Sequence, residues 1–127
     1  MTHDAIIDIS ILENLPEEWP EDLLPAIQKD LKETDYKIII LDDDPTGTQT
    51  AQDLPVLTTW SVEQLQEELE NNYSAFFILT NSRSLPETEA VALAQELGVN
   101  IKAASERAGI RTVIISRSDS TLRGHFP

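Results

Sequence analysis

Three short polar segments hold side chains that could do chemistry, and each directly follows an apolar run. They span residues 42–48, 80–84 and 117–125. They combine carboxylates, which can accept a proton or hydrogen bonds from hydroxyl groups, with arginines, whose planar fork suits a substrate carboxylate. These groups together suit a small anionic substrate that carries hydroxyl groups.

The three apolar runs have the pattern of buried parallel strands. They span residues 37–41, 75–79 and 112–116. Each run is continuous rather than alternating, which is typical of a strand covered on both faces. Helical patterns lie between them, and the order β-α-β-α-β favours right-handed crossovers and parallel pairing. We predict an α/β fold, a three-layer sandwich around a parallel sheet, incomplete at one edge.

The helical patterns carry start and stop signals. Ser61 and Gln64 have the spacing of a capping box, and so do Ser84 and Glu87. Gly109 is a suitable stop for the second of these helices, because glycine readily adopts the left-handed conformation that ends many helices.

The polar segments should meet in space. In open parallel sheets, ligands bind beyond the carboxyl ends of the strands, and all three segments lie there. We therefore expect Asp44, Arg83 and Asp119 to line one cleft at the same end of the sheet. Each segment alone also suits a local role, because Asp-Pro-Thr-Gly favours a turn, Asn-Ser-Arg-Ser a helix cap and Asp-Ser-Thr an Asx-type turn with Arg123 on the surface. The binding hypothesis would be excluded only if every one of these local interpretations held at once, so we prefer the binding hypothesis.

Composition restricts the partners and the compartment. The 127 residues carry a formal net charge of −14 and include no cysteine. A strongly acidic chain is a poor match for nucleic acid or anionic lipid. No apolar run approaches the roughly 20 residues that a membrane span needs. A disulfide framework and a thiolate metal site are excluded. We expect a cytoplasmic protein with no nucleic-acid partner and no membrane partner.

The first polar segment resembles the motif of the haloacid dehalogenase-like phosphatases, in which a strand leads into Asp-x-Asp-x-Thr. Asp42, Asp44 and Thr46 have this spacing. The resemblance implies Asp42 as the nucleophile, Asp44 as the acid/base and Thr80 as the hydroxyl at the second strand end. The later lysine and the second acidic pair of that family, which complete its Mg²⁺ site, are missing, so the site is incomplete.

A second resemblance covers the chain from about residue 37 to the last residue. Residues 43–47 (DDPTG), 81–85 (NSRSL) and 118–124 (SDSTLRG) are similar to the successive motifs of the four-carbon acid sugar kinases. The last motif is the most specific. The resemblance implies phosphorylation of a four-carbon sugar acid, such as threonate, erythronate or an oxo derivative, with ATP and Mg²⁺ as cofactors. It also implies an amino-terminal domain that holds the sugar acid and a carboxyl-terminal domain that holds the nucleotide.

The same resemblance implies the roles of individual residues. The implied substrate contacts are Asp43, Asp44, Arg83, Asp119, Ser120 and Arg123. Either Asp44 or Asp119 is implied to take the proton of the acceptor hydroxyl, and the sequence does not choose between them. No metal ligand is assigned in this chain, because ATP and Mg²⁺ are implied to bind mainly to the carboxyl-terminal domain.

The resemblance also indicates how the chain is divided. Residues 1–36 are expected to form an acidic arm and a helix over residues 22–32, and residues 37–127 the front part of the sugar-acid-binding domain. The sequence stops directly after its most specific motif, so we expect a fragment that lacks the nucleotide-binding domain and is inactive alone. A non-catalytic binding or orphan fragment is the alternative. Because an open sheet edge exposes backbone groups and apolar surface, we also expect a homo-oligomer, or an acidic arm that orders across the open edge as a substitute cover.

We predict that Arg123→Lys weakens sugar-acid binding in the complete enzyme. A lysine supplies a point charge but not the planar fork, and hydrogen bonds to charged groups contribute about 1.5–3 kcal/mol. The expected loss of affinity is roughly tenfold or more. An unchanged binding isotherm would assign Arg123 a structural role instead.

Overall fold

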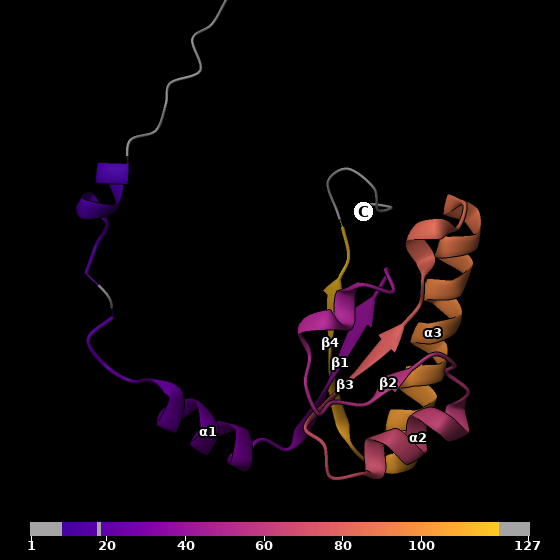
Figure 1. The fold of residues 1–127 in the computed structure, drawn as a ribbon. Helices are drawn as coiled ribbons and strands as arrows, with labels where there is room; N and C mark the ends of the chain where they lie inside the picture. The colour runs from indigo at the N-terminus through magenta and orange to yellow at the C-terminus, as the bar shows by residue number, and fades with distance from the viewer. Residues whose placement is uncertain (1–8, 18, 120–127) are drawn as a thin grey trace, which may run out of the picture. The chain divides into compact units, whose positions relative to one another are not determined.

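The computed structural model describes residues 9–17 and 19–119, and the chain divides into two compact units, Met1–Glu33 and Thr34–Pro127 (Figure 1). Unit 1 contains a short 3-10 helix, η1 (Ile9–Asn14), and helix α1 (Leu24–Glu33). The helix predicted over residues 22–32 is therefore present, displaced by one or two residues. The Asp22 carboxylate accepts a hydrogen bond from the Leu24 amide at 3.0 Å, and Pro25 lies in the first turn, where its missing N–H costs least. Ser120 and Arg123 lie outside the described residues.

Unit 2 is an α/β unit built on a four-stranded parallel sheet. Its elements are β1 (Tyr36–Asp42), η2 (Gly47–Thr50), β2 (Val56–Leu57), α2 (Val62–Glu70), β3 (Ala75–Leu79), η3 (Ser82–Ser84), α3 (Glu87–Ala108) and β4 (Arg111–Arg117). The strand order is β2-β3-β1-β4, and every pairing is parallel. The predicted fold class is confirmed. Strand β2 was not anticipated, because two paired residues leave no recognisable apolar run.

One face of the sheet packs against α2 and α3, which lie side by side (Figure 1). Ile39 of β1 is in register with Phe76 of β3, and side chains alternate along a strand, so Ile39, Phe76 and Ile78 all point to this face. The helices contribute the remaining members of the core, which are Leu65, Leu69, Leu97, Ile101 and Ala104. The described residues of unit 2 thus supply the sheet and one helical layer.

Strand β4 departs from the expected burial on both faces. Among the described residues it pairs with β1 alone, and Val113, Ile114 and Ile115 are each between 43% and 48% exposed. A continuous apolar run therefore predicted the strand correctly but not its cover. The reason is its place at the edge of the described sheet, where α3 contacts the start of β4 through the Ser105 and Thr112 hydroxyls but leaves the middle of the strand exposed.

One of the two predicted capping boxes is confirmed and the other is wrong. The Ser61 hydroxyl accepts from the Gln64 amide, and the Gln64 side chain accepts from the Ser61 amide, both at 3.3 Å. Helix α3 instead begins at Glu87, and the Ser84 hydroxyl donates to the Asn81 carbonyl at 2.8 Å. The cause is Pro86, because the residue before a proline is held in extended backbone and cannot continue a helical turn from Ser84.

The end of α3 is as predicted. Gly109 adopts a left-handed conformation with φ of 67°, and its amide donates to the Ser105 carbonyl. The amide of Ile110 donates to the same carbonyl at 3.2 Å. The chain thereby turns directly from α3 into β4. Parallel pairing of β4 with β1 then places their carboxyl ends side by side.

Lys37 joins the start of β1 to the end of α2. Its side chain is almost fully buried, and its ammonium group donates to the carbonyls of Glu68 at 2.7 Å and Asn71 at 2.8 Å. It also donates to the Asn71 side-chain oxygen at 2.7 Å. Burial lowers the pKa of Lys37, and the negative charge of Glu68 partly opposes this shift. The last carbonyls of α2 find their partner here, as a cation at a helix carboxyl end favours.

We expect Lys37→Met to lower the free energy of unfolding by about 1.5–3 kcal/mol, because it leaves buried carbonyls without a charged donor. Urea denaturation measures this change. Lys102→Met is the matched control, since Lys102 is exposed and lies 4.0 Å from the carboxylate of Glu106, itself exposed. It should shift stability by less than about 0.5 kcal/mol. Equal effects of the two substitutions would contradict the capping role of Lys37.

Candidate functional site

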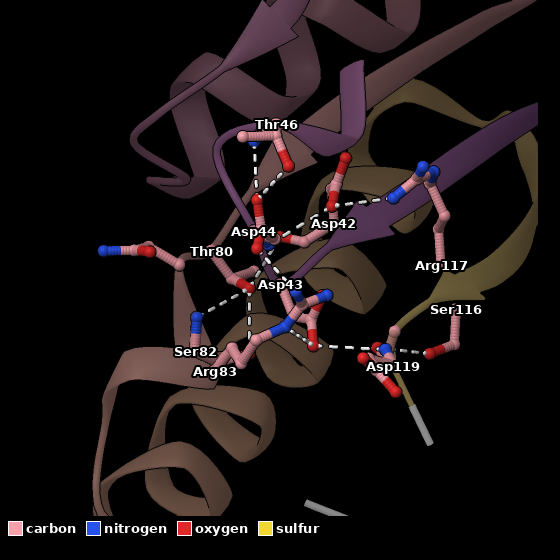
Figure 2. A network of polar contacts seen from close by, with 12 residues as sticks. Asp42, Asp43, Asp44, Thr46, Thr80, Ser82, Arg83, Ser116, Arg117 and Asp119 are labelled. Carbon is pink, nitrogen blue, oxygen red and sulfur yellow. Dashed lines mark hydrogen bonds and ion pairs between the residues drawn. The ribbon is translucent and has the colours of Figure 1, made fainter. Parts of the chain in front are cut away.

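The carboxyl ends of β1, β3 and β4 lie level at one end of the sheet. Asp42, the last residue of β1, is in register with Leu79 of β3 on one side and Arg117 of β4 on the other. The polar segments that follow these strands therefore meet, as parallel pairing predicts. Figure 2 shows the side chains that gather there. Asp44, Arg83 and Asp119 are predicted to line one cleft at the same end of the sheet. All three lie at that end. Arg83 lines the cavity there, but Asp44 and Asp119 are not among its lining residues.

Arg83 holds the first two polar segments together. Its Nε and Nη2 atoms donate to the two carboxylate oxygens of Asp43 at 3.2 and 2.8 Å, and Nη1 donates to Asp44 at 2.5 Å. The backbone adds a parallel link, because the Arg83 amide donates to the Asp43 carbonyl at 3.2 Å. The hydrogen bond to Asp43 raises the pKa of Arg83, although burial opposes the shift. The fork thus points at two aspartates of this chain rather than at an open position.

Asp44 sits in a tight turn that the same segment makes. One carboxylate oxygen accepts from the Thr46 amide at 2.7 Å and from the Thr46 hydroxyl at 2.5 Å. The other oxygen accepts from Arg83. The Gly47 amide closes the turn on the Asp44 carbonyl at 2.9 Å. These contacts fix the orientation of a carboxylate that stays partly exposed, as an acceptor for ligand hydroxyl groups must.

Asp119 brings the third segment to the same place. Its amide donates to the Asp43 carboxylate at 3.3 Å, so Asp43 contacts both Arg83 and the segment after β4 (Figure 2). Asp43 itself is buried. Its carboxylate therefore acts as the common acceptor between the second and third segments.

A match to one protein-family model covers residues 38–127, which include all three polar segments. That family is described as a sugar-binding N-terminal domain. The chain belongs to this family. No curated protein and no solved structure matches the chain. No helix in the described residues is both long and apolar enough to cross a membrane.

Asp42 of this sugar-binding domain is fully buried. One carboxylate oxygen accepts from the Asp44 amide at 3.2 Å and lies 3.6 Å from Nη1 of Arg117. The other oxygen has no hydrogen-bond partner among the described residues. It lies against Gly47, where a β-carbon would overlap the carboxylate. Asp42 is therefore enclosed by its own loop.

A cavity of about 260 Å³ opens beside the Arg83 guanidinium group, between the strand ends and α3. Asp43, Arg83 and Ser116 contribute to its polar lining. Its apolar side is formed by Ala90, Ala94, Leu97 and their neighbours on α3. Arg117 begins the third polar segment, but no role for it or for Ser116 was inferred from the sequence. Their register could have indicated them, because both lie opposite the end of β1.

Among residues 9–17 and 19–119, no three acidic or histidine side chains are grouped to hold a metal ion. The carboxylates of Asp43 and Asp44 contact Arg83 instead. Helix α3 has Glu87 and Glu89 in its first turn, which disfavours a phosphate at that helix end.

We predict that Gly47→Ala disrupts the site, because the added methyl group would overlap the buried Asp42 carboxylate. The free energy of unfolding should fall by about 1–3 kcal/mol, as overpacking typically costs. Gly98→Ala is the control. Gly98 lies inside α3, and a methyl group added there would meet open space, so this change should raise stability by about 0.5–1 kcal/mol. Chemical denaturation measures the free energy of unfolding of both variants. A Gly47→Ala variant as stable as the wild type would contradict the interpretation.

Proposed function

We propose that this sugar-binding domain binds a four-carbon sugar acid and is the substrate-binding part of an ATP-dependent kinase. The observation that carries the proposal is the convergence of three polar segments on the Asp43 carboxylate. These are the segments that resemble the successive motifs of the four-carbon acid sugar kinases. The same family of sugar-binding domains is found in such kinases, which supports the proposal.

The chemistry of the site suits a polyol chain. Sugar hydroxyl groups are donors, and the carboxylates of Asp44 and Asp119 offer acceptor oxygens at the sheet edge. Hydrogen bonds to a charged acceptor are shorter and stronger than neutral ones. Arg83 and Thr46 orient the Asp44 carboxylate before any ligand arrives, which reduces the entropy lost on binding.

Either carboxylate could also take the proton of the hydroxyl group that is phosphorylated. Phosphoryl transfer depends mainly on positioning and on electrostatic stabilisation, and a carboxylate near the acceptor hydroxyl completes the site. In the proposed kinase, ATP and Mg²⁺ supply the phosphoryl group and balance its charge, and a nucleotide-binding domain holds them. Asp44 and Asp119 remain equal candidates for the base.

The phosphatase alternative gains no support from the geometry. A nucleophilic carboxylate must reach the phosphorus atom of its substrate. Asp42, the residue with that role in the phosphatase motif, is fully buried against Gly47. Asp44, the corresponding acid/base, contacts Arg83 and Thr46.

Calorimetric titration of the chain with threonate and erythronate tests the proposal. We expect binding, and a loss of affinity of about tenfold or more for Asp44→Asn and Asp119→Asn, because each removes a charged acceptor. Asp35→Asn removes the same charge at the other end of the sheet, where Asp35 contacts Arg111, and should leave binding unchanged. Absence of binding to every four-carbon acid by the folded wild-type chain would refute the proposal.

A further inference from the structure

A negatively charged ligand meets an unfavourable negative charge at the carboxyl ends of β1, β3 and β4. Four carboxylates gather there, those of Asp42, Asp43, Asp44 and Asp119. Among the described residues at these strand ends, the cations are Arg83 and Arg117. A ligand carboxylate needs a cation whose donors are still available, because the surrounding negative charge otherwise repels it.

Arg83 does not meet that need. Its Nε, Nη1 and Nη2 atoms all donate to Asp43 or Asp44, and its side chain is only 17% exposed. Removing it from either aspartate to bind a ligand would leave a mostly buried carboxylate without its charged partner. Arg83 is therefore a positioning residue for the two aspartates.

Arg117 has the opposite properties. It is the last residue of β4, its side chain is 48% exposed, and its described polar contact is the 3.6 Å approach to Asp42. That distance is too long for a hydrogen bond, so the contact orients the guanidinium group without using its donors. Arg83 and Arg117 approach the aspartates from opposite sides, because β1 lies between β3 and β4 (Figure 2).

We propose that Arg117 binds the carboxylate of the sugar acid and makes the site select acids over neutral polyols. This inference rests on the proposed function. Asp42 is then the positioning residue for Arg117, held in place by the Asp44 amide and by the close approach of Gly47. The buried charge of Asp42 keeps the guanidinium group at the strand end, while the ligand occupies its exposed donors. The carboxylates of Asp44 and Asp119 accept from hydroxyl groups of the same ligand.

A purely structural role for Arg117 predicts different results. If Arg117 only balances the buried charge of Asp42, its loss should lower stability and weaken acids and polyols alike. If Arg117 binds the carboxylate, its loss should weaken acids alone. The two roles therefore separate when the same variant is titrated with ligands that differ only in the carboxylate.

The first test compares threonate and erythronate with the neutral polyols threitol and erythritol, using calorimetry on the full chain. Arg117→Gln should lose about tenfold or more in affinity for the acids and keep its affinity for the polyols. Arg117→Lys keeps the charge but not the fork, so its loss should be smaller. Arg107→Gln removes an arginine that pairs with Glu63 on the surface and should change neither affinity. Equal weakening of acids and polyols by Arg117→Gln would overturn the inference.

The second test needs no variant, so it holds even if Arg117→Gln fails to fold. In the ¹⁵N-labelled wild-type chain, the Nε–Hε resonance of Arg117 should shift saturably with added threonate or erythronate, and threitol should leave it in place. Arg83, already bound to Asp43, is the internal reference and should move less. Acid binding that leaves the Arg117 resonance unmoved would overturn the inference while the proposed function stands. Failure of the wild-type chain to bind any acid would overturn both.

Discussion

The fork between Arg83 and the aspartates Asp43 and Asp44 is the interaction on which the site depends. It joins the end of β1 to the segment after β3, about forty positions further along the chain. Asp43 is buried, so its charge requires a partner that is both charged and well oriented. The same carboxylate accepts from the Asp119 amide and so positions the third segment. Loss of the Arg83 side chain would therefore leave the carboxylate shared by the second and third segments without its charged partner.

The two ends of β1 carry charged groups with separate tasks. At the amino end, buried Lys37 binds the last carbonyls of α2 and connects the sheet to its helical layer. At the carboxyl end, buried Asp42 meets the half-exposed Arg117. Stability and the proposed ligand binding are thus served by different charges on one strand.

The division of work between the two arginines gives the site its proposed selectivity. Arg83 neutralises part of the acidic cluster and orients the Asp44 carboxylate, which we propose accepts from ligand hydroxyl groups, while the half-exposed Arg117 is the proposed donor to a ligand anion. A single arginine could not do both, because each donor that contacts an aspartate is lost to the ligand. The cavity beside the fork, with its apolar wall from α3, limits how many further polar contacts a ligand can make on that side.

The amino-acid sequence by itself determined the three long parallel strands, the capping box of Ser61 and Gln64, the stop at Gly109, and the meeting of the polar segments. These depend on local periodicity and on the geometry of parallel pairing. Only the tertiary structure decided what each charge contacts. It directed Arg83 to Asp43 and Asp44, enclosed Asp42 behind Gly47, and left Arg117 half exposed. The physical reason is that burial and strand register, which are properties of the packed chain, select among the several partners that any charged side chain could reach.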